Sequence, residues 1–206
     1  MEDHKRLVRQ GYNAIANDYL AARTAESADI KLLDDFMAHL PAGALVLDAG
    51  CGAGVPISRI LQNKSRVVGV DFAETQLGLA RRLVPDASFV CQDLTALGFA
   101  PNCFDAICSY YAIIHIPRQE HEALFRRFRH ILKPGGLAFL CLGANDLAMD
   151  MNDDYFGVPM HWSHYDAKTN LALIEKCGLH LVWSRMIPDS HWPHSSHLFV
   201  LAQKPS

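Results

Sequence analysis

The stretch that decides the fold of this chain is Val46-Leu47-Asp48-Ala49-Gly50-Cys51-Gly52-Ala53-Gly54. An apolar run that reaches an acid and then enters a glycine-rich turn is typical of a strand that leads into a helix and lets the backbone approach a ligand closely. The glycine spacing is GxGxG, whereas the dinucleotide fingerprint GxGxxG needs a glycine where this chain has Val55. Bare amides at a helix N-terminus bind a pyrophosphate. An acid such as Asp48 near the turn does not suit a pyrophosphate, and it favours a nucleotide ligand that carries positive charge.

Two more strand ends that follow in the sequence complete a nucleoside-binding pattern. The run Val67-Val68-Gly69-Val70 ends in Asp71, whose carboxylate can accept hydrogen bonds from both hydroxyls of a ribose. Phe72 follows it and can lie against an adenine ring. After a third short strand, Asp93 can accept a hydrogen bond from the exocyclic amine of adenine. Each element alone is a weak signal, but three successive strand ends at this spacing make a strong one.

Apolar runs alternate with amphipathic stretches over the rest of the chain, which predicts an α/β fold. We expect a mostly parallel seven-stranded sheet with an antiparallel edge pair and helices on both faces. Lys133-Pro134-Gly135-Gly136 predicts a helix stop followed by a tight turn. The predicted strands are 44–47, 66–70, 88–91, 104–109, 137–142, 179–186 and 198–202, and the predicted helices are 7–19, 28–40, a helix ending near 61, 74–83, 119–132 and 167–177.

The segment from about 44 to 142 resembles the class I methyltransferases that use S-adenosylmethionine (SAM), in particular small-molecule enzymes such as those of ubiquinone and menaquinone biosynthesis. The matching stretches are Leu-Asp-Ala-Gly-Cys-Gly-Ala-Gly, Val-Gly-Val-Asp-Phe, Gln-Asp-Leu, Phe-Asp-Ala-Ile-Cys-Ser and Leu-Lys-Pro-Gly-Gly-Leu. The resemblance implies a Rossmann-like class I methyltransferase fold, SAM as cofactor and S-adenosylhomocysteine (SAH) as product. It places Gly50, Gly52 and Gly54 around the methionine moiety, Asp71 on the ribose, and Asp93 with Leu94 at the adenine. We assign Asp48, Phe72 and Ser109 to the same donor site.

The N-terminal segment Gly11–Tyr19 resembles the lid helix of that family. In this interpretation Tyr12 and Tyr19 close over the donor. Packing between helices is the alternative role for the two tyrosines.

The acceptor end of the predicted site is rich in histidine. His115 follows the strand 104–109 in a loop that faces the transferred methyl in this fold, and an imidazole can act as a base near neutral pH. His161, His164 and His197 lie in two further histidine-rich segments that also contain Trp162 and Trp192. One or more of these histidines could orient or deprotonate an acceptor, could hold a divalent metal, or could be ordinary polar loop residues. We predict acceptor chemistry for His115, His161, His164 and His197 and no metal.

The segment Asp153-Asp154-Tyr155-Phe156-Gly157 is expected to form part of a mobile cap over the site. The acidic metal motif of catechol-type methyltransferases cannot be placed in this sequence. The motif of amino-directed nucleic-acid methyltransferases is also missing, since the corresponding position reads Ser109-Tyr110-Tyr111-Ala112. Both observations favour a metal-independent enzyme that acts on a small molecule.

The length of 206 residues predicts one domain, with a helical lid at 1–43, a SAM-binding core at 44–142 and an acceptor-side cap at 143–206. The net charge of −3 disfavours nucleic acid and anionic lipid as partners. Six cysteines without framework spacing and the lack of a signal peptide predict a cytoplasmic protein. We expect it to be a monomer or homodimer. Two alternatives are a non-methylating member of the fold, cyclase-like or a binding protein, and an NAD(P)-dependent oxidoreductase, which Val55 disfavours.

Overall fold

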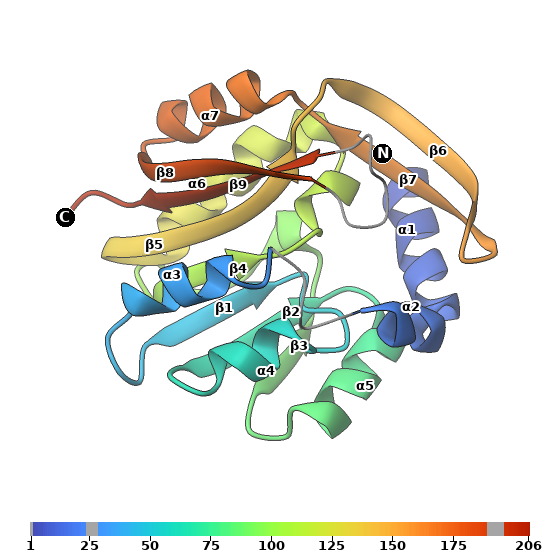
Figure 1. Ribbon diagram of the computed structural model, residues 1–206, viewed down its shortest axis with the longest axis horizontal. Coiled ribbons are helices and arrows are strands. Elements are labelled where there is room, and N and C mark those ends of the chain that lie inside the picture. Colours follow the sequence, from blue (N-terminus) through green and yellow to red (C-terminus); the bar gives the residue numbers. More distant parts are fainter. Residues whose placement is uncertain (1, 24–28, 189–195) are drawn as a thin grey trace.

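The computed structural model describes residues 2–23, 29–188 and 196–206, and its main feature is a seven-stranded sheet (Figure 1). The strand order is β3-β2-β1-β4-β5-β9-β8. Strands β1 to β5 pair in parallel, and β9 runs antiparallel to both of its neighbours. The predicted mostly parallel sheet with an antiparallel pair at one edge is confirmed. The strands are β1 Leu45–Ala49, β2 Arg66–Asp71, β3 Ser88–Cys91, β4 Phe104–Ser109, β5 Leu132–Gly143, β8 His180–Pro188 and β9 Ser196–Gln203.

Helices cover both faces of this sheet. One face carries α6 and α7, and the other carries α3 and α4, while α5 packs against β2 and β3 (Figure 1). Within the described residues, no helix is long and apolar enough to cross a membrane. The bounds are α3 Leu32–Ala38, α4 Ile57–Leu61, α5 Glu74–Leu83, α6 His121–Ile131 and α7 Ala167–Lys176, with short 3₁₀ turns η1 Leu94–Ala96, η2 Ile113–His115 and η3 Arg118–Glu120.

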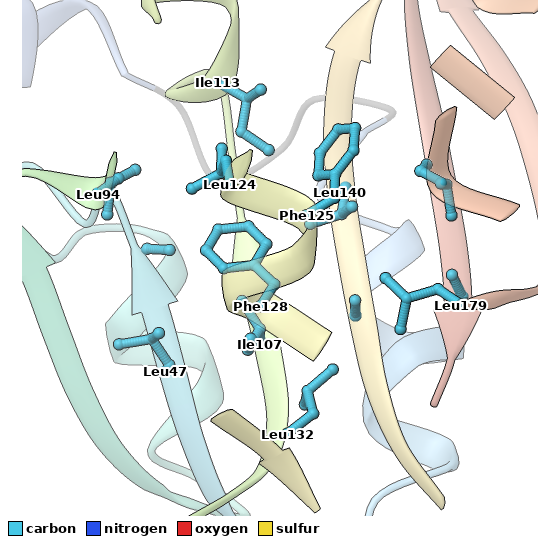
Figure 2. Packing of buried hydrophobic residues seen from close by; sticks show 14 of the residues in the cluster. Leu47, Leu94, Ile107, Ile113, Leu124, Phe125, Phe128, Leu132, Leu140 and Leu179 are labelled. Carbon is cyan, nitrogen blue, oxygen red and sulfur yellow. The ribbon is translucent and has the colours of Figure 1, made fainter. Parts of the chain in front are cut away.

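The core on the α6 face is built by alternate residues of the strands, because side chains of a strand point in turn to opposite faces. In β5, Leu140 packs on this face, whereas its neighbour Phe139 packs on the α3 face. Figure 2 shows Phe125 and Phe128 of α6 over the sheet residues Ile107 and Leu140. Both phenylalanine side chains are fully buried. The central strands are therefore apolar on both faces, as the sequence predicts for a parallel sheet.

The predicted helix 7–19 is two helices, α1 Glu2–Ala14 and α2 Ala16–Ala22, separated at Ile15. Helix α1 lies against β7 and α5 (Figure 1). Gly11 lets α1 approach closely, since a Cβ there would lie 2.9 Å from the methyl carbon of Met160. The predicted helix 28–40 is shorter, and its Phe36 stacks on Phe139 at a ring-centroid distance of 5.3 Å.

The segment predicted to form part of a mobile cap lies in a second, two-stranded sheet. Strands β6 Leu147–Tyr155 and β7 Val158–His164 pair antiparallel as a hairpin. Its turn has positive φ at Phe156 (54°) and Gly157 (84°), the backbone that two-residue hairpin turns require. Strand β5 also differs from the prediction. It begins at Leu132 and includes residues 133–136, which were predicted to form a turn, and its pairing with β4 has a register shift there.

Candidate functional site

The candidate site is a pocket of about 660 Å³ at the carboxyl ends of β1, β2, β3 and β4. The strand order changes direction between β1 and β4, and open α/β sheets bind ligands at such a point. This volume includes space that is open to solvent at the mouth of the pocket. Helix α1 and the tyrosines near it cover the strand ends. The lining residues are Val8, Tyr12, Tyr19, Gly50, Gly52, Asp71, Phe72, Gln76, Gln92, Asp93, Leu94, Tyr110, Tyr111, Ala112, His115 and Ile116.

The turn after β1 brings bare backbone to the pocket. Gly50 and Gly52 have φ of 82° and 51°, in the left-handed region where residues with a side chain are strained. A Cβ on Gly50 would lie 2.1 Å from the Cβ of Ala112, which also lines the pocket. The amides of Gly50 and Cys51 both donate to the carbonyl of Val70, which ties this turn to β2. Only glycine at position 50 therefore keeps both the turn and the pocket.

Asp71, at the end of β2, holds its carboxylate in the pocket wall by two backbone hydrogen bonds. One oxygen accepts from the amide of Gly52 and the other from the amide of Ala73, each at 2.9 Å. Burial raises the pKa of Asp71, while these backbone donors counteract the rise. The carboxylate thus lies between the glycine turn and the start of α5, the place where the sequence predicts a ribose-binding acid.

Polar contacts on both sides fasten α1 over the pocket. The ammonium group of Lys5 lies 3.2 Å from Asp93 and 2.6 Å from Glu120, and it donates to the hydroxyl of Thr95. Asp93 also caps η1 by accepting from the amide of Thr95 at 2.8 Å. At the other side of the helix, Arg9 forms an ion pair with Glu74 of α5. The carboxylate at position 93 lines the pocket and at the same time joins α1 to the sheet edge.

The hydrogen bonds of His115 fix its tautomer. Its Nδ1 lies 2.7 Å from the carbonyl oxygen of His161, which can only accept, so Nδ1 carries the proton. Its Nε2 lies 2.8 Å from the hydroxyl of Tyr12 and therefore accepts from it. Burial lowers the pKa of His115 to about 4, so the imidazole is neutral at pH 7. Because Tyr12 donates its proton to His115, its oxygen can also act as an acceptor, and the hydroxyl of Tyr155 lies within hydrogen-bonding reach of it.

Three predicted acceptor histidines do not line the pocket. His161 stacks on His4 at a centroid distance of 4.7 Å and supplies its carbonyl to His115. His164 bonds to the carbonyl of Asn145 at 2.8 Å, and the buried ring of His197 lies 4.9 Å from Tyr111. Within the described chain, no group of three His, Cys, Asp or Glu residues has the arrangement of a metal site. Trp192 lies outside the described residues.

Asp48, Gly54 and Ser109, predicted to contact the cofactor, also lie behind the pocket wall. Asp48 accepts a hydrogen bond from the hydroxyl of Ser58, and Ser109 donates to the carbonyl of Ala49. A Cβ on Gly54 would lie 3.1 to 3.4 Å from side chains of α5, β3 and Val84, so this glycine serves close helix packing. Asp48 does not line the pocket because side chains alternate along β1: Leu47 and Ala49 face the α6 side, and Asp48 faces the opposite side.

The buried carboxyl of Asp48 predicts a pH dependence of stability. Burial raises its pKa from 3.8 to about 7, so its contribution to folding is complete below about pH 4 and lost as the pH rises through 7. Asp48→Asn keeps the shape and an acceptor for Ser58 but does not titrate. We expect the variant to gain on the wild type by about 2–4 kcal/mol between pH 4 and pH 8. Urea unfolding of both proteins across this range measures the gain. A stability difference that stays constant with pH would contradict the raised pKa.

Sequence reasoning missed several pocket residues. Tyr110, Tyr111 and Ala112 follow β4 directly, and Tyr111 has φ of 52°, which turns the chain toward the pocket. Gln92 follows β3 in the same way. The signal was available, because residues just beyond the ends of parallel strands meet at one edge of the sheet. Val8 and Gln76 carry no such signal, since they reach the pocket through the packing of α1 on α5.

Comparison with known proteins agrees with this geometry. Residues 46–136 match the family described as "Methyltransferase domain". The chain is 30% identical over 185 residues to the biotin biosynthesis bifunctional protein BioHC of Cellvibrio japonicus, covering 86% of this chain and 36% of that protein. It is 32% identical over 104 residues to a ubiquinone biosynthesis O-methyltransferase of Pseudomonas paraeruginosa, covering 48% and 44%. The chain thus spans less than half the length of either, and 21% to 30% of three other curated relatives.

A solved structure supports the fold. The 1,6-didemethyltoxoflavin-N1-methyltransferase of Burkholderia thailandensis, with bound 1,6-didemethyltoxoflavin and SAH, superposes with a TM-score of 0.77 at 20% identity. The match covers 100% of this chain and 90% of that chain. The aligned region therefore includes the N-terminal helices and the β6–β7 hairpin as well as the sheet.

Proposed function

Because this chain belongs to the class I SAM-dependent methyltransferases, we propose that it transfers the methyl group of SAM to an oxygen or nitrogen atom of a small-molecule metabolite. The observation that carries the proposal is the pocket at the carboxyl ends of β1 to β4, where a glycine turn and a partly buried acid, Asp71, lie under α1. The nature of the acceptor, an oxygen or nitrogen atom of a small molecule, is part of the proposal. The relatives are named for chemically different substrates, so the comparison does not select one acceptor for this chain.

The residues of the pocket fit SAM as the donor. Gly50 and Gly52 keep the turn after β1 free of side chains, and Asp71 offers carboxylate oxygens for a ribose. Phe72 and Leu94 supply apolar surface for an adenine, with Asp93 at its edge. When bound, SAM supplies an electrophilic methyl group on a sulfonium. The pocket residues then have to align an acceptor with that group and exclude water.

Tyr12 and His115 are the residues that we propose to act at the acceptor side. The neutral imidazole accepts the hydroxyl proton of Tyr12, and the oxygen of Tyr12 can in turn accept a hydrogen bond from an O–H or N–H nucleophile. His115 is then a positioning residue, because it acts through Tyr12. A pKa of about 4 keeps this arrangement intact at neutral pH.

Tyr12→Phe tests this assignment. We expect kcat to fall about ten- to hundredfold, because the variant lacks the acceptor oxygen, while the affinity for SAH changes by less than about threefold. His115→Gln, which keeps an oxygen able to accept from Tyr12, should lose less. Tyr165→Phe, on a tyrosine that does not line the pocket, is the matched control. An unchanged kcat in Tyr12→Phe would remove Tyr12 from the chemistry.

Incubation of the purified protein with methyl-labelled SAM and a fractionated metabolite extract tests the proposed function. Label in a small-molecule product, with an equal amount of SAH, would support methyl transfer and identify the acceptor. SAM binding together with conversion of a metabolite that carries no label would instead favour the non-methylating alternative. A parallel incubation with a chelator tests the metal alternative, since loss of label there would contradict a metal-independent reaction.

We further propose that the reaction takes place in the cytoplasm and involves no nucleic acid. All six cysteines are free thiols, which suits a reducing compartment. The net charge of −3 gives no broad attraction to a polyanion. A monomer or homodimer remains the expected state, and sedimentation at several concentrations measures it.

A further inference from the structure

The guanidinium group of Arg23 lies against two tyrosines of the pocket. Its central carbon is 5.9 Å from the ring centroid of Tyr19 and 5.2 Å from that of Tyr111, both within the range of a cation–π contact. Tyr19 belongs to α2 and Tyr111 to the loop after β4, and both line the pocket. A permanent positive charge is therefore held beside the pocket by its aromatic walls, although Arg23 is only partly buried.

The donors of Arg23 are unused within the described part of the chain, where its guanidinium makes no hydrogen bond and no ion pair. Among the other arginines, Arg66, Arg82 and Arg127 also make no such contact with the described residues, but none of them lies against an aromatic ring of the pocket. The remaining eight are engaged. They either pair with carboxylates or donate to backbone carbonyls, namely Arg6, Arg9, Arg118, Arg126 and Arg185 in the first group and Arg59, Arg81 and Arg129 in the second. Stacking on aromatic rings occupies the face of a guanidinium and leaves its N–H edge available.

Asp29 is the acid whose charge acts on Arg23, but its carboxylate forms its hydrogen bond with Tyr111. Its charge acts on Arg23 through space. Its carboxylate accepts from the hydroxyl of Tyr111 at 3.2 Å, and its carbonyl accepts from the hydroxyl of Tyr110 at 2.9 Å. Asp29 thus holds the tyrosine wall in place and does not neutralise Arg23 by direct contact.

Charge is distributed unevenly along the pocket. The acids that line it, Asp71 and Asp93, lie at the predicted nucleoside end. The end near Tyr12 and His115 is lined by aromatic and imidazole groups, with Arg23 beside them. A planar guanidinium with free N–H groups binds a carboxylate or a phosphate through paired hydrogen bonds.

We propose that the methyl acceptor carries an anionic group, a carboxylate or a phosphate, that is bound by Arg23 against the Tyr19 and Tyr111 rings. This inference rests on the proposed function and narrows its substrate class. The anion serves as the point of attachment that aligns the acceptor, and the rings accommodate a flat or unsaturated body next to it.

Calorimetric titration of the SAH-loaded protein with benzoate, phenyl phosphate and benzamide tests the proposal. The three probes share a ring, and only the first two carry a negative charge. We expect one or both anions to bind at least about tenfold more tightly than neutral benzamide. The stronger of the two anions identifies a carboxylate or a phosphate as the recognised group.

Arg23→Gln should abolish the preference for the anion and leave the SAH affinity unchanged. Arg23→Lys, which keeps the charge but not the planar fork, should retain part of it. The matched control is Arg185→Gln, because Arg185 also stacks on an aromatic ring, that of Trp183 at 4.6 Å, but pairs with Asp35. This control should change nothing.

Equal binding of all three probes, no binding of any of them, or a preference that survives Arg23→Gln would overturn the proposal. A loss of SAH affinity in Arg23→Gln would place Arg23 in the donor site and overturn it as well. Methyl transfer is measured separately with labelled SAM, so failure of the proposed function and failure of the anion site give different results.

Discussion

Asp71→Ala should weaken SAH binding about ten- to hundredfold. The variant removes the carboxylate that is expected to bind the ribose, and it leaves the partly buried amides of Gly52 and Ala73 without their acceptor. An unpaired buried polar group costs about 1–3 kcal/mol, and each 1.4 kcal/mol corresponds to a tenfold change in affinity. Calorimetric titration with SAH measures the effect, with circular dichroism to verify that the variant is folded.

Two further variants separate the carboxylate from its surroundings. Asp71→Asn keeps the volume and one acceptor oxygen, so its loss of affinity should be intermediate. Asp86→Ala removes an exposed carboxylate from the turn before β3 and should bind SAH like the wild type. An SAH affinity in Asp71→Ala that equals that of the Asp86 variant would remove Asp71 from the donor site.

Gly50→Ala should both destabilise the protein and abolish tight SAH binding. Alanine at φ of 82° costs about 1–2 kcal/mol, and its Cβ would lie 2.1 Å from the Cβ of Ala112. Relieving that overlap has to move the turn after β1 or the loop after β4, and both line the pocket. Overpacking adds about 1–3 kcal/mol, so we expect a total loss of about 2–5 kcal/mol in urea unfolding.

Gly43→Ala is the matched control for this substitution. Gly43 has a similar φ of 72°, but a Cβ there would meet nothing within 4 Å. It should lose only the backbone contribution of about 1–2 kcal/mol and keep its SAH affinity. Equal losses of stability in the two variants would mean that the contact between Gly50 and Ala112 is not tight, and the close approach argued for this turn would be wrong.

The sheet was predictable because its signals are local. Each parallel strand is an apolar run that ends at an acid or a turn, and β1, β2, β3 and β4 lie within a few residues of their predicted positions. The hairpin β6–β7 was missed because much of it is exposed, so its strands lack a clear alternation of apolar and polar residues. Its turn residues Phe156 and Gly157 were the available signal.

The candidate site was predictable where a residue ends a strand and unpredictable where tertiary contacts decide. Asp71 and Asp93 lie in the pocket wall because they follow β2 and β3. The tautomer of His115 depends on the carbonyl of His161, which lies 46 residues away in the sequence. Arg23 gave no signal, because its two tyrosine contacts come from different elements of the fold. We predicted Asp48 in the donor site because it is close to the glycines in the sequence. Strand alternation instead turns its side chain away from the face of Leu47 and Ala49.

A crystal structure of the protein with SAH tests the central claim most directly, namely that the pocket under α1 holds the methyl donor. We predict both ribose hydroxyls within hydrogen-bonding distance of the Asp71 carboxylate, the adenine beside Phe72 and Leu94, and the sulfur on the side of Tyr12 and His115. SAH bound at any other place, or bound here with its ribose away from Asp71, would contradict the account.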